Sequence, residues 1–104
     1  SCYIIYMEDT LFSNVSLETL LIYREHGFDW EDPTYINIFR WIWNVKHYHP
    51  HIDAFPGDES NKAFVILESP NFINKPYKFA ADSYDDAIIK LVNYISENYE
   101  TYLK

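Results

Sequence analysis

The segment 33–48, PTYINIFRWIWNVKHY, constrains the fold more than any other part of this chain. Asp32 followed by Pro33 predicts a helix start, because an Asp side chain caps free amides and a proline at the first helical position loses no hydrogen bond. We expect the helix to end near 45–48, before Pro50. Most of its apolar residues form two stripes along the helix. One stripe is Ile38, Ile42 and Val45, and the other is Ile36, Phe39 and Trp43, while Trp41 lies on neither. So wide an apolar arc predicts either burial on most sides or an aromatic face shown to a partner.

Two further helices are predicted on either side of this one. Ser16 can cap a helix that ends at Gly27, and Glu18 in its first turn suits the helix dipole. Ser83 and Asp86 have nearly the spacing of a capping box, which predicts a long final helix. The first of these helices carries Leu17, Leu20, Leu21 and Arg24 on one face, and the last carries Ala87, Ile88, Leu91, Val92, Ile95, Tyr99 and Tyr102 on its core side.

Strands are predicted where β-branched and aromatic residues run together, at 2–7, 63–68 and 77–82. Between the central helix and the second strand, residues 51–61 are predicted to form a loop with a turn at Pro56-Gly57-Asp58. The order β-α-α-β-β-α predicts a small α+β domain over residues 1–104. We expect a three-stranded, mostly antiparallel sheet with helices packed on one face, in which 63–68 and 77–82 pair and 2–7 joins an edge or the centre.

The net charge of −8 and the single cysteine limit the classes of partner and compartment. An excess of carboxylates argues against binding to nucleic acid or to an anionic membrane, and it favours either a basic partner or simple solubility. Cys2 by itself excludes an intramolecular disulfide and a cysteine-based zinc site, which suits a reducing, cytoplasmic compartment. No apolar run approaches the ~18 residues of a membrane span, and no signal peptide is visible, so no membrane association is expected.

Three histidines alternate in the stretch NVKHYHPHID: His47, His49 and His51, with Asp53 continuing the spacing. In an extended chain they would point to one side and resemble a metal site. However, His47 falls in the predicted last helical turn and Pro50 interrupts the run. A helix end passing into a polar loop is the preferred interpretation, because Lys46 and His47 there would offset the negative end of the dipole. We therefore expect no metal and no cofactor, and a metal-binding or small-ligand domain built on this loop is kept as an alternative.

No pattern typical of catalysis is present. The chain has only two glycines, and it lacks the P-loop, GxGxxG, GxSxG and HExxH patterns. Phosphate-binding turns need glycine, because the backbone must approach the phosphate closely. A hydrolytic pair of one histidine and one carboxylate in the 49–58 loop is conceivable, but no nucleophile or metal motif accompanies it. We expect that the protein is not an enzyme.

The candidate partner-binding residues combine acids with aromatic rings and histidines. In the DWEDP segment, carboxylates flank a tryptophan that could anchor an interface, although the same residues could instead pack on the next helix and cap it. The second acidic segment follows the histidines, where a solvated turn is the simpler interpretation. The candidates are Asp29, Trp30, Glu31, Tyr35, Tyr48, His49, His51, Asp53, Asp58 and Glu59.

These features predict a small acidic inhibitor that binds a basic protein partner, such as a nuclease toxin or another nucleic-acid-acting enzyme. In general character the chain is similar to bacterial toxin-immunity proteins and phage-encoded nuclease inhibitors, although no motif carries that similarity. Carboxylates would pair with the lysines and arginines that normally hold phosphate, and aromatic anchors would exclude water. A homodimeric structural subunit, joined through Trp41 or Trp43 of the aromatic helix, is a further alternative.

Overall fold

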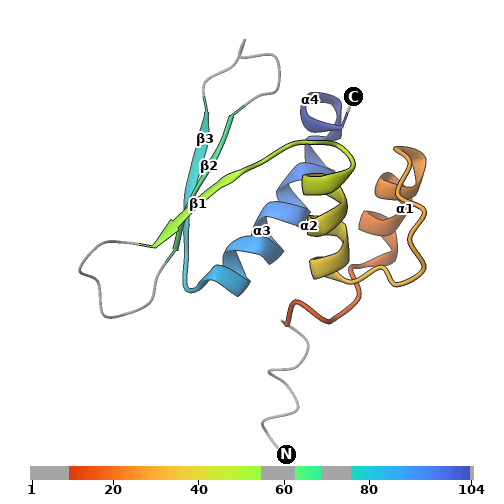
Figure 1. Ribbon diagram of the computed structural model, residues 1–104, viewed down its shortest axis with the longest axis horizontal. Helices are drawn as coiled ribbons and strands as arrows, with labels where there is room; N and C mark the ends of the chain where they lie inside the picture. The colour runs from red at the N-terminus through yellow and green to blue at the C-terminus, as the bar shows by residue number, and fades with distance from the viewer. Residues whose placement is uncertain (1–9, 55–62, 69–75, 104) are drawn as a thin grey trace, which may run out of the picture.

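The computed structural model describes residues 10–54, 63–68 and 76–103. Figure 1 shows a three-stranded sheet on one side of the molecule and the helices on the other. The elements are α1 (Leu17–Glu25), α2 (Tyr35–Asn44), β1 (His51–Ala54), β2 (Ala63–Leu67), β3 (Tyr77–Ala81), α3 (Tyr84–Glu97) and α4 (Tyr99–Tyr102). The predicted α+β class, with an antiparallel sheet of three strands covered on one face by helices, is confirmed. The strand predicted at 2–7 lies outside the described residues.

The sheet has the order β1-β2-β3, and both pairings are antiparallel. The predicted pairing of the second and third strands is therefore confirmed. The loop predicted over 51–61 is wrong for residues 51–54, which form β1. Ile52 lies opposite Val65 of β2, so backbone pairing with a segment distant in sequence decides the conformation of these four residues. The turn predicted at Pro56-Gly57-Asp58 lies outside the described residues.

Helix α3 lies between the sheet and the other two long helices (Figure 1). It contacts all three strands on one side and both α1 and α2 on the other. On β2, Ala63, Val65 and Leu67 are fully buried, whereas the alternating residues between them are only partly buried. This period of two shows that one face of the sheet packs on α3.

The start of α2 differs from the prediction. Thr34, and not Asp32, is the N-cap, and its side-chain oxygen accepts a hydrogen bond from the amide of Asn37. The reason is tertiary: the Val15 amide donates to the Pro33 carbonyl, and Thr34 forms a β-bridge with Asn14. These contacts hold residues 33–34 extended, so the helix begins at Tyr35. It ends at Asn44, earlier than the predicted 45–48.

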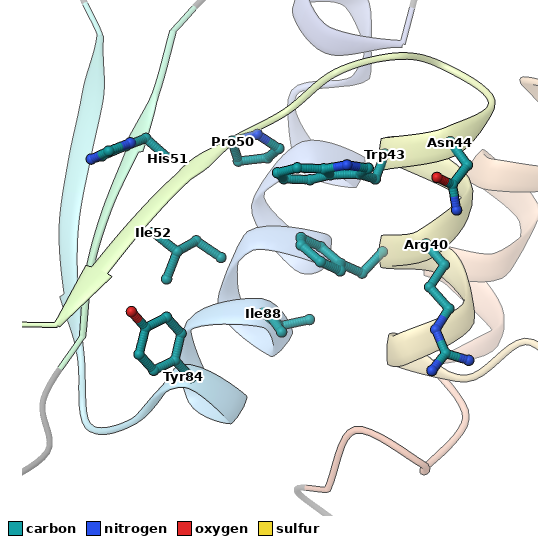
Figure 2. Close-up of a pocket in the computed structure, with 9 residues that line it drawn as sticks. Arg40, Trp43, Asn44, Pro50, His51, Ile52, Tyr84 and Ile88 are labelled. Carbon is teal, nitrogen blue, oxygen red and sulfur yellow. The ribbon is translucent and has the colours of Figure 1, made fainter.

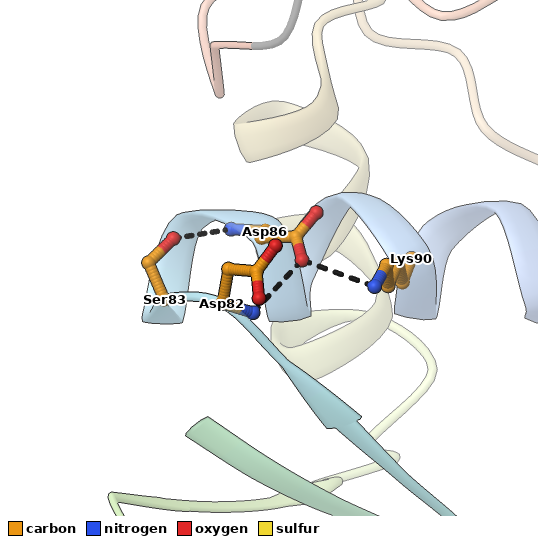
Figure 3. Close-up of polar contacts among 4 residues, drawn as sticks. All are labelled: Asp82, Ser83, Asp86 and Lys90. Atoms are coloured by element: carbon orange, nitrogen blue, oxygen red, sulfur yellow. Dashed lines mark hydrogen bonds and ion pairs between the residues drawn. The ribbon is translucent and has the colours of Figure 1, made fainter. Parts of the chain in front are cut away.

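The predicted caps of the other two helices are confirmed. Ser16 accepts a hydrogen bond from the amide of Thr19, and Gly27 follows the end of α1 with a positive φ of 103°, a conformation that glycine adopts readily. Ser83 accepts from the amide of Asp86 at 3.0 Å (Figure 3). The predicted continuous final helix is interrupted: α3 ends at Glu97, and a short α4 follows Asn98.

The side chain of Asp86 completes the start of α3 in a variant of the capping box. Its carboxylate accepts a hydrogen bond from the amide of Asp82, one residue before the N-cap, and it also lies 3.2 Å from the ammonium of Lys90 (Figure 3). A carboxylate in the first turn is stabilised by the helix dipole as well. These contacts fix the point at which the chain leaves β3 and enters α3.

The core of the helical layer is built around Trp41, which is 1% exposed. Its ring makes edge-on contacts with Tyr23 of α1, at 6.0 Å between ring centres, and with Phe28, at 5.6 Å. The Tyr23 hydroxyl donates to the Val92 carbonyl of α3 at 2.7 Å, so one side chain joins three helices. The burial predicted for the aromatic helix is confirmed for Ile38, Trp41 and Ile42, whereas Trp43 is 39% exposed.

We expect Tyr23→Phe to lower the free energy of unfolding by about 1 kcal/mol, because it removes one buried hydrogen bond and leaves the ring packing intact. Urea unfolding monitored by circular dichroism measures this. Tyr84→Phe is the matched control: Tyr84 is 48% exposed, so its hydroxyl is free to bind water, and the change should stay within about 0.5 kcal/mol. Equal effects of the two substitutions would contradict the structural role of the Tyr23 hydroxyl.

Alkaline pH should destabilise the fold through Tyr102. Burial, together with the nearby Tyr94, raises the pKa of Tyr102 to about 12. Because tyrosine in an unfolded chain ionises near pH 10, folding favours the neutral hydroxyl, and this contribution is complete below about pH 10. It is lost as the pH rises from about 10 through 12. Urea unfolding across that range should show a smaller loss in Tyr102→Phe than in the wild type, and an equal loss would refute the assignment.

Candidate functional site

Helix α1 carries apolar residues on two faces, and only one of them belongs to the core. Thr19 and Tyr23 are buried against the rest of the protein. Leu17 and Leu21, four residues apart and therefore on one face, are 70% and 55% exposed. Phe12, in the turn that leads into α1, is 77% exposed. Large apolar side chains left in solvent on one helix face are typical of an interaction surface.

Carboxylates flank this leucine pair on the helix and recur on the loop that follows α1. Glu18 and Glu25 are three and four residues from Leu21, so they flank it on the helix surface. Arg24 holds the following loop against the helix, because its Nη1 donates to the carbonyls of Phe28 at 2.9 Å and Trp30 at 2.7 Å. That loop carries the exposed acids Asp29 and Glu31. We call Leu17, Leu21, Glu18, Glu25, Asp29 and Glu31 the α1 face.

The charge of the α1 face is not neutralised within the described part of the chain. The ion pairs there join His51 to Asp53 and Lys90 to Asp86, and neither involves a carboxylate of the α1 face. Arg24 is engaged with backbone carbonyls, and its guanidinium lies over the Phe28 ring, 4.9 Å from the ring centre. The carboxylates of this face are therefore available to cations from outside.

Trp30 and Tyr35, both predicted as partner-binding residues, turn largely inward. Trp30 is partly buried, packs against the core and lies 6.1 Å from Phe28, ring centre to ring centre. Tyr35 is also partly buried, and its hydroxyl lies 3.5 Å from Oδ1 of Asn93. Trp30 thus packs the loop against the core, while Asp29 and Glu31, its two neighbours in sequence, are exposed to solvent.

The other predicted site residues lie across the molecule, at the end of α2 and on β1 (Figure 1). The Tyr48 hydroxyl donates to the Glu68 carbonyl at 2.7 Å, which joins the chain after α2 to the end of β2. The exposed side chains of His51 and Asp53 pair with each other. Asp58 and Glu59 lie outside the described residues. The predicted set therefore divides into two groups, and only Asp29 and Glu31 belong to the α1 face.

The alternating histidines do not converge. His47 is exposed and has a positive φ of 55°, which turns the chain after α2. The His49 ring packs on Trp43, with 4.4 Å between ring centres, and its Nε2 donates to the Trp43 carbonyl at 3.1 Å. His51 is bound to Asp53 on β1. Within residues 10–54, 63–68 and 76–103, no three His, Cys, Asp or Glu side chains are placed to hold a metal ion together.

Sequence reasoning missed the exposure of Leu17 and Leu21, because it grouped them with Leu20 on one helix face. Leu20 packs against the core, whereas the other two point away from it. The available signal was the position of Arg24, which shares the outer face with Leu21. Tyr23 and Thr19 instead share the inner face, at a spacing of four.

The comparisons with known proteins give no guide to the function: no protein-family model, curated protein or solved structure matches this chain. Among the described residues, no helix has the length and apolar character needed to cross a membrane.

We expect that replacing both Leu17 and Leu21 by Ser changes the free energy of unfolding by less than about 1 kcal/mol, because both side chains are mostly in solvent and Ser lowers helix propensity only slightly. Leu91→Ala, at a fully buried position of α3, should cost about 2–5 kcal/mol. Urea unfolding of the two variants makes the comparison. A large loss in the double Ser variant would show that the leucines are structural.

Proposed function

We propose that this protein is a small acidic inhibitor that binds and neutralises a basic protein partner through the α1 face. The observation that carries the proposal is the pair of exposed leucines, Leu17 and Leu21, beside carboxylates that form no ion pair with any other described residue. Apolar side chains at the centre of an interface supply binding energy, and a charged rim guides the encounter and favours partners of opposite charge.

The proposed mechanism needs no chemistry from the inhibitor. The leucines would enter an apolar depression on the partner, while Glu18, Glu25 and Glu31 pair with lysine and arginine side chains around it. A nuclease or another nucleic-acid-acting enzyme presents such cations where it holds phosphate. Inhibition then results from occupation of that surface, as in the toxin-immunity and phage-inhibitor classes that the composition resembles.

A homodimer formed through the same face is disfavoured by charge. In a symmetric dimer the same patch of each copy faces its partner. Glu18 and Glu25 of one copy would then approach their equivalents, and none of the six residues of the α1 face is basic. Arg24 beside them is held against the following loop by its hydrogen bonds to backbone carbonyls. Like charges at an interface oppose association. A partner of opposite charge avoids this cost.

The first test is capture of a partner from the source cells on immobilised protein, with elution by increasing salt. We expect one basic protein to bind in stoichiometric amount and to elute as salt screens the charges. Glu25→Lys with Glu31→Lys should weaken its binding by about tenfold or more at low salt. The matched control is Glu68→Lys with Glu97→Lys, which changes the net charge by the same amount. It alters two exposed acids outside the α1 face, one just after β2 and one in α3, so it should bind the partner as the wild type does.

The leucines and the inhibition are tested on the purified partner. Leu21→Ser should weaken binding by roughly tenfold at any salt concentration, because the loss is apolar and is not screened. Addition of one equivalent of the wild-type protein should abolish the partner's activity on nucleic acid. The proposed function would be contradicted if the two charge-reversed variants lost binding equally. It would also be contradicted if the bound partner retained full activity.

A further inference from the structure

A groove of about 520 Å³ lies between α2 and β1, and the start of α3 lines it as well. All the residues that line it belong to the described part of the chain. Figure 2 shows Trp43 of α2 and Ile52 of β1 pointing towards each other across the groove, with Ile88 of α3 between them. Pockets that bind small molecules have volumes of roughly 300–1,000 Å³, so this groove is large enough to hold one.

Aromatic rings line the groove on two sides. On α2, Phe39 and Trp43 lie one turn apart, with 5.9 Å between their ring centres. The His49 ring, which lies outside the lining, packs on Trp43 with 4.4 Å between ring centres and helps to hold the indole in place. Tyr84, in the first turn of α3, lies across from Trp43, and both side chains are exposed (Figure 2). Rings held in this way can pack against a flat aromatic ligand at little cost in side-chain entropy.

A second row of α2 side chains places polar groups at the border of the groove. Arg40 and Asn44 both line it and are four residues apart, so they follow one line along the helix, beside the line of the two rings. Figure 2 shows the Arg40 side chain running along α2 towards the first turn of that helix. A ligand with an apolar body in the groove can therefore place one polar group at this border.

The charge of the groove is opposite to that of the protein as a whole. The chain has 16 acidic and 8 basic residues, yet no Asp or Glu lines the groove, whereas Arg40 does. Within the described part of the chain, the Arg40 side chain makes neither an ion pair nor a hydrogen bond. His51 also lines the groove, but it is paired with Asp53, and Figure 2 shows its ring directed away from Trp43. An anionic group is therefore expected at Arg40, because a guanidinium can bind a carboxylate through two parallel hydrogen bonds.

We infer that this groove is a binding site for a small aromatic carboxylate. The flat ring system lies between Trp43 on one side and Ile52 and Tyr84 on the other, and the carboxylate pairs with the guanidinium of Arg40. At one end, the chain that connects α2 to β1 bounds the groove through Pro50, which suits a compact ligand better than an extended peptide. The site shares no residue with the α1 face, so it adds a second binding function that does not depend on the proposed one.

Two matched probes test the site: naphthaleneacetate, which has a flat ring system and a carboxylate, and naphthaleneacetamide, its neutral analogue. Each is titrated into the full chain, and the amide and indole N–H signals are followed by NMR. We expect the acid to bind with a dissociation constant of roughly 1 mM or lower, and the amide about tenfold more weakly, because only the acid can pair with Arg40. The indole signal of Trp43 should shift, whereas that of Trp30, in the loop after α1, should not.

Substitutions separate the charge from the apolar walls. Arg40→Gln should weaken binding of the acid about tenfold and leave the amide unchanged, because it removes the cation alone. Lys78→Gln, which removes the same charge from an exposed position of β3, is the matched control and should affect neither probe. Tyr84→Ala should weaken both probes by roughly threefold or more, because it removes apolar surface that both contact. Circular dichroism checks that each variant remains folded.

Three results would overturn the inference. The first is that neither probe shifts the Trp43 signal, or that Trp30 shifts equally. The second is equal affinity for acid and amide, or an Arg40→Gln variant that binds the acid as the wild type does, because the groove would then be a general apolar surface. The third is a Trp43 signal that changes on dilution of the protein alone, which would identify a second copy as the occupant. No partner protein is present in these measurements, so they leave the function proposed for the α1 face unaffected.

Discussion

The edge-on packing of Trp41 against Tyr23 and Phe28 is the contact on which the arrangement of the helices depends. It joins α2 to α1 and to the segment after α1, and the Tyr23 hydroxyl extends the connection to the Val92 carbonyl of α3. Aromatic pairs in this geometry gain energy beyond the area they bury. Because α3 in turn packs on all three strands, the positions of α1 and α2 relative to the sheet follow from this cluster.

The same arrangement decides which surfaces remain open. Tyr23 directs one face of α1 inward, so Leu17 and Leu21 face outward. Arg24 holds the following loop, which carries the exposed acids Asp29 and Glu31, against the same helix. On the other side of α2, Trp43 lines the groove between α2 and β1. The described residues thus form two separate apolar surfaces: the exposed leucines of α1, which carboxylates of the same helix flank, and the groove between α2 and β1.

Local signals in the sequence identified most of the elements. Ser16, Gly27 and Ser83 mark helix ends because a capping side chain or a glycine acts on the backbone a few residues away. The composition of 63–68 and 77–82 predicts two strands, and their expected antiparallel pairing is confirmed. Local rules misplaced the start of α2, because the bridge between Asn14 and Thr34 overrides the preference of Asp32 and Pro33.

The sequence by itself determined the acidic charge, the α+β class, and two of the acids that the α1 face presents, since composition and short-range periodicity are properties of the chain alone. Only the tertiary structure decided that residues 51–54 are a strand, that the three histidines have separate partners, and that Trp30 supports a loop while two leucines are left in solvent. Each of these outcomes depends on a partner distant in sequence or on which face of a helix the core takes, and local preferences carry no information about either.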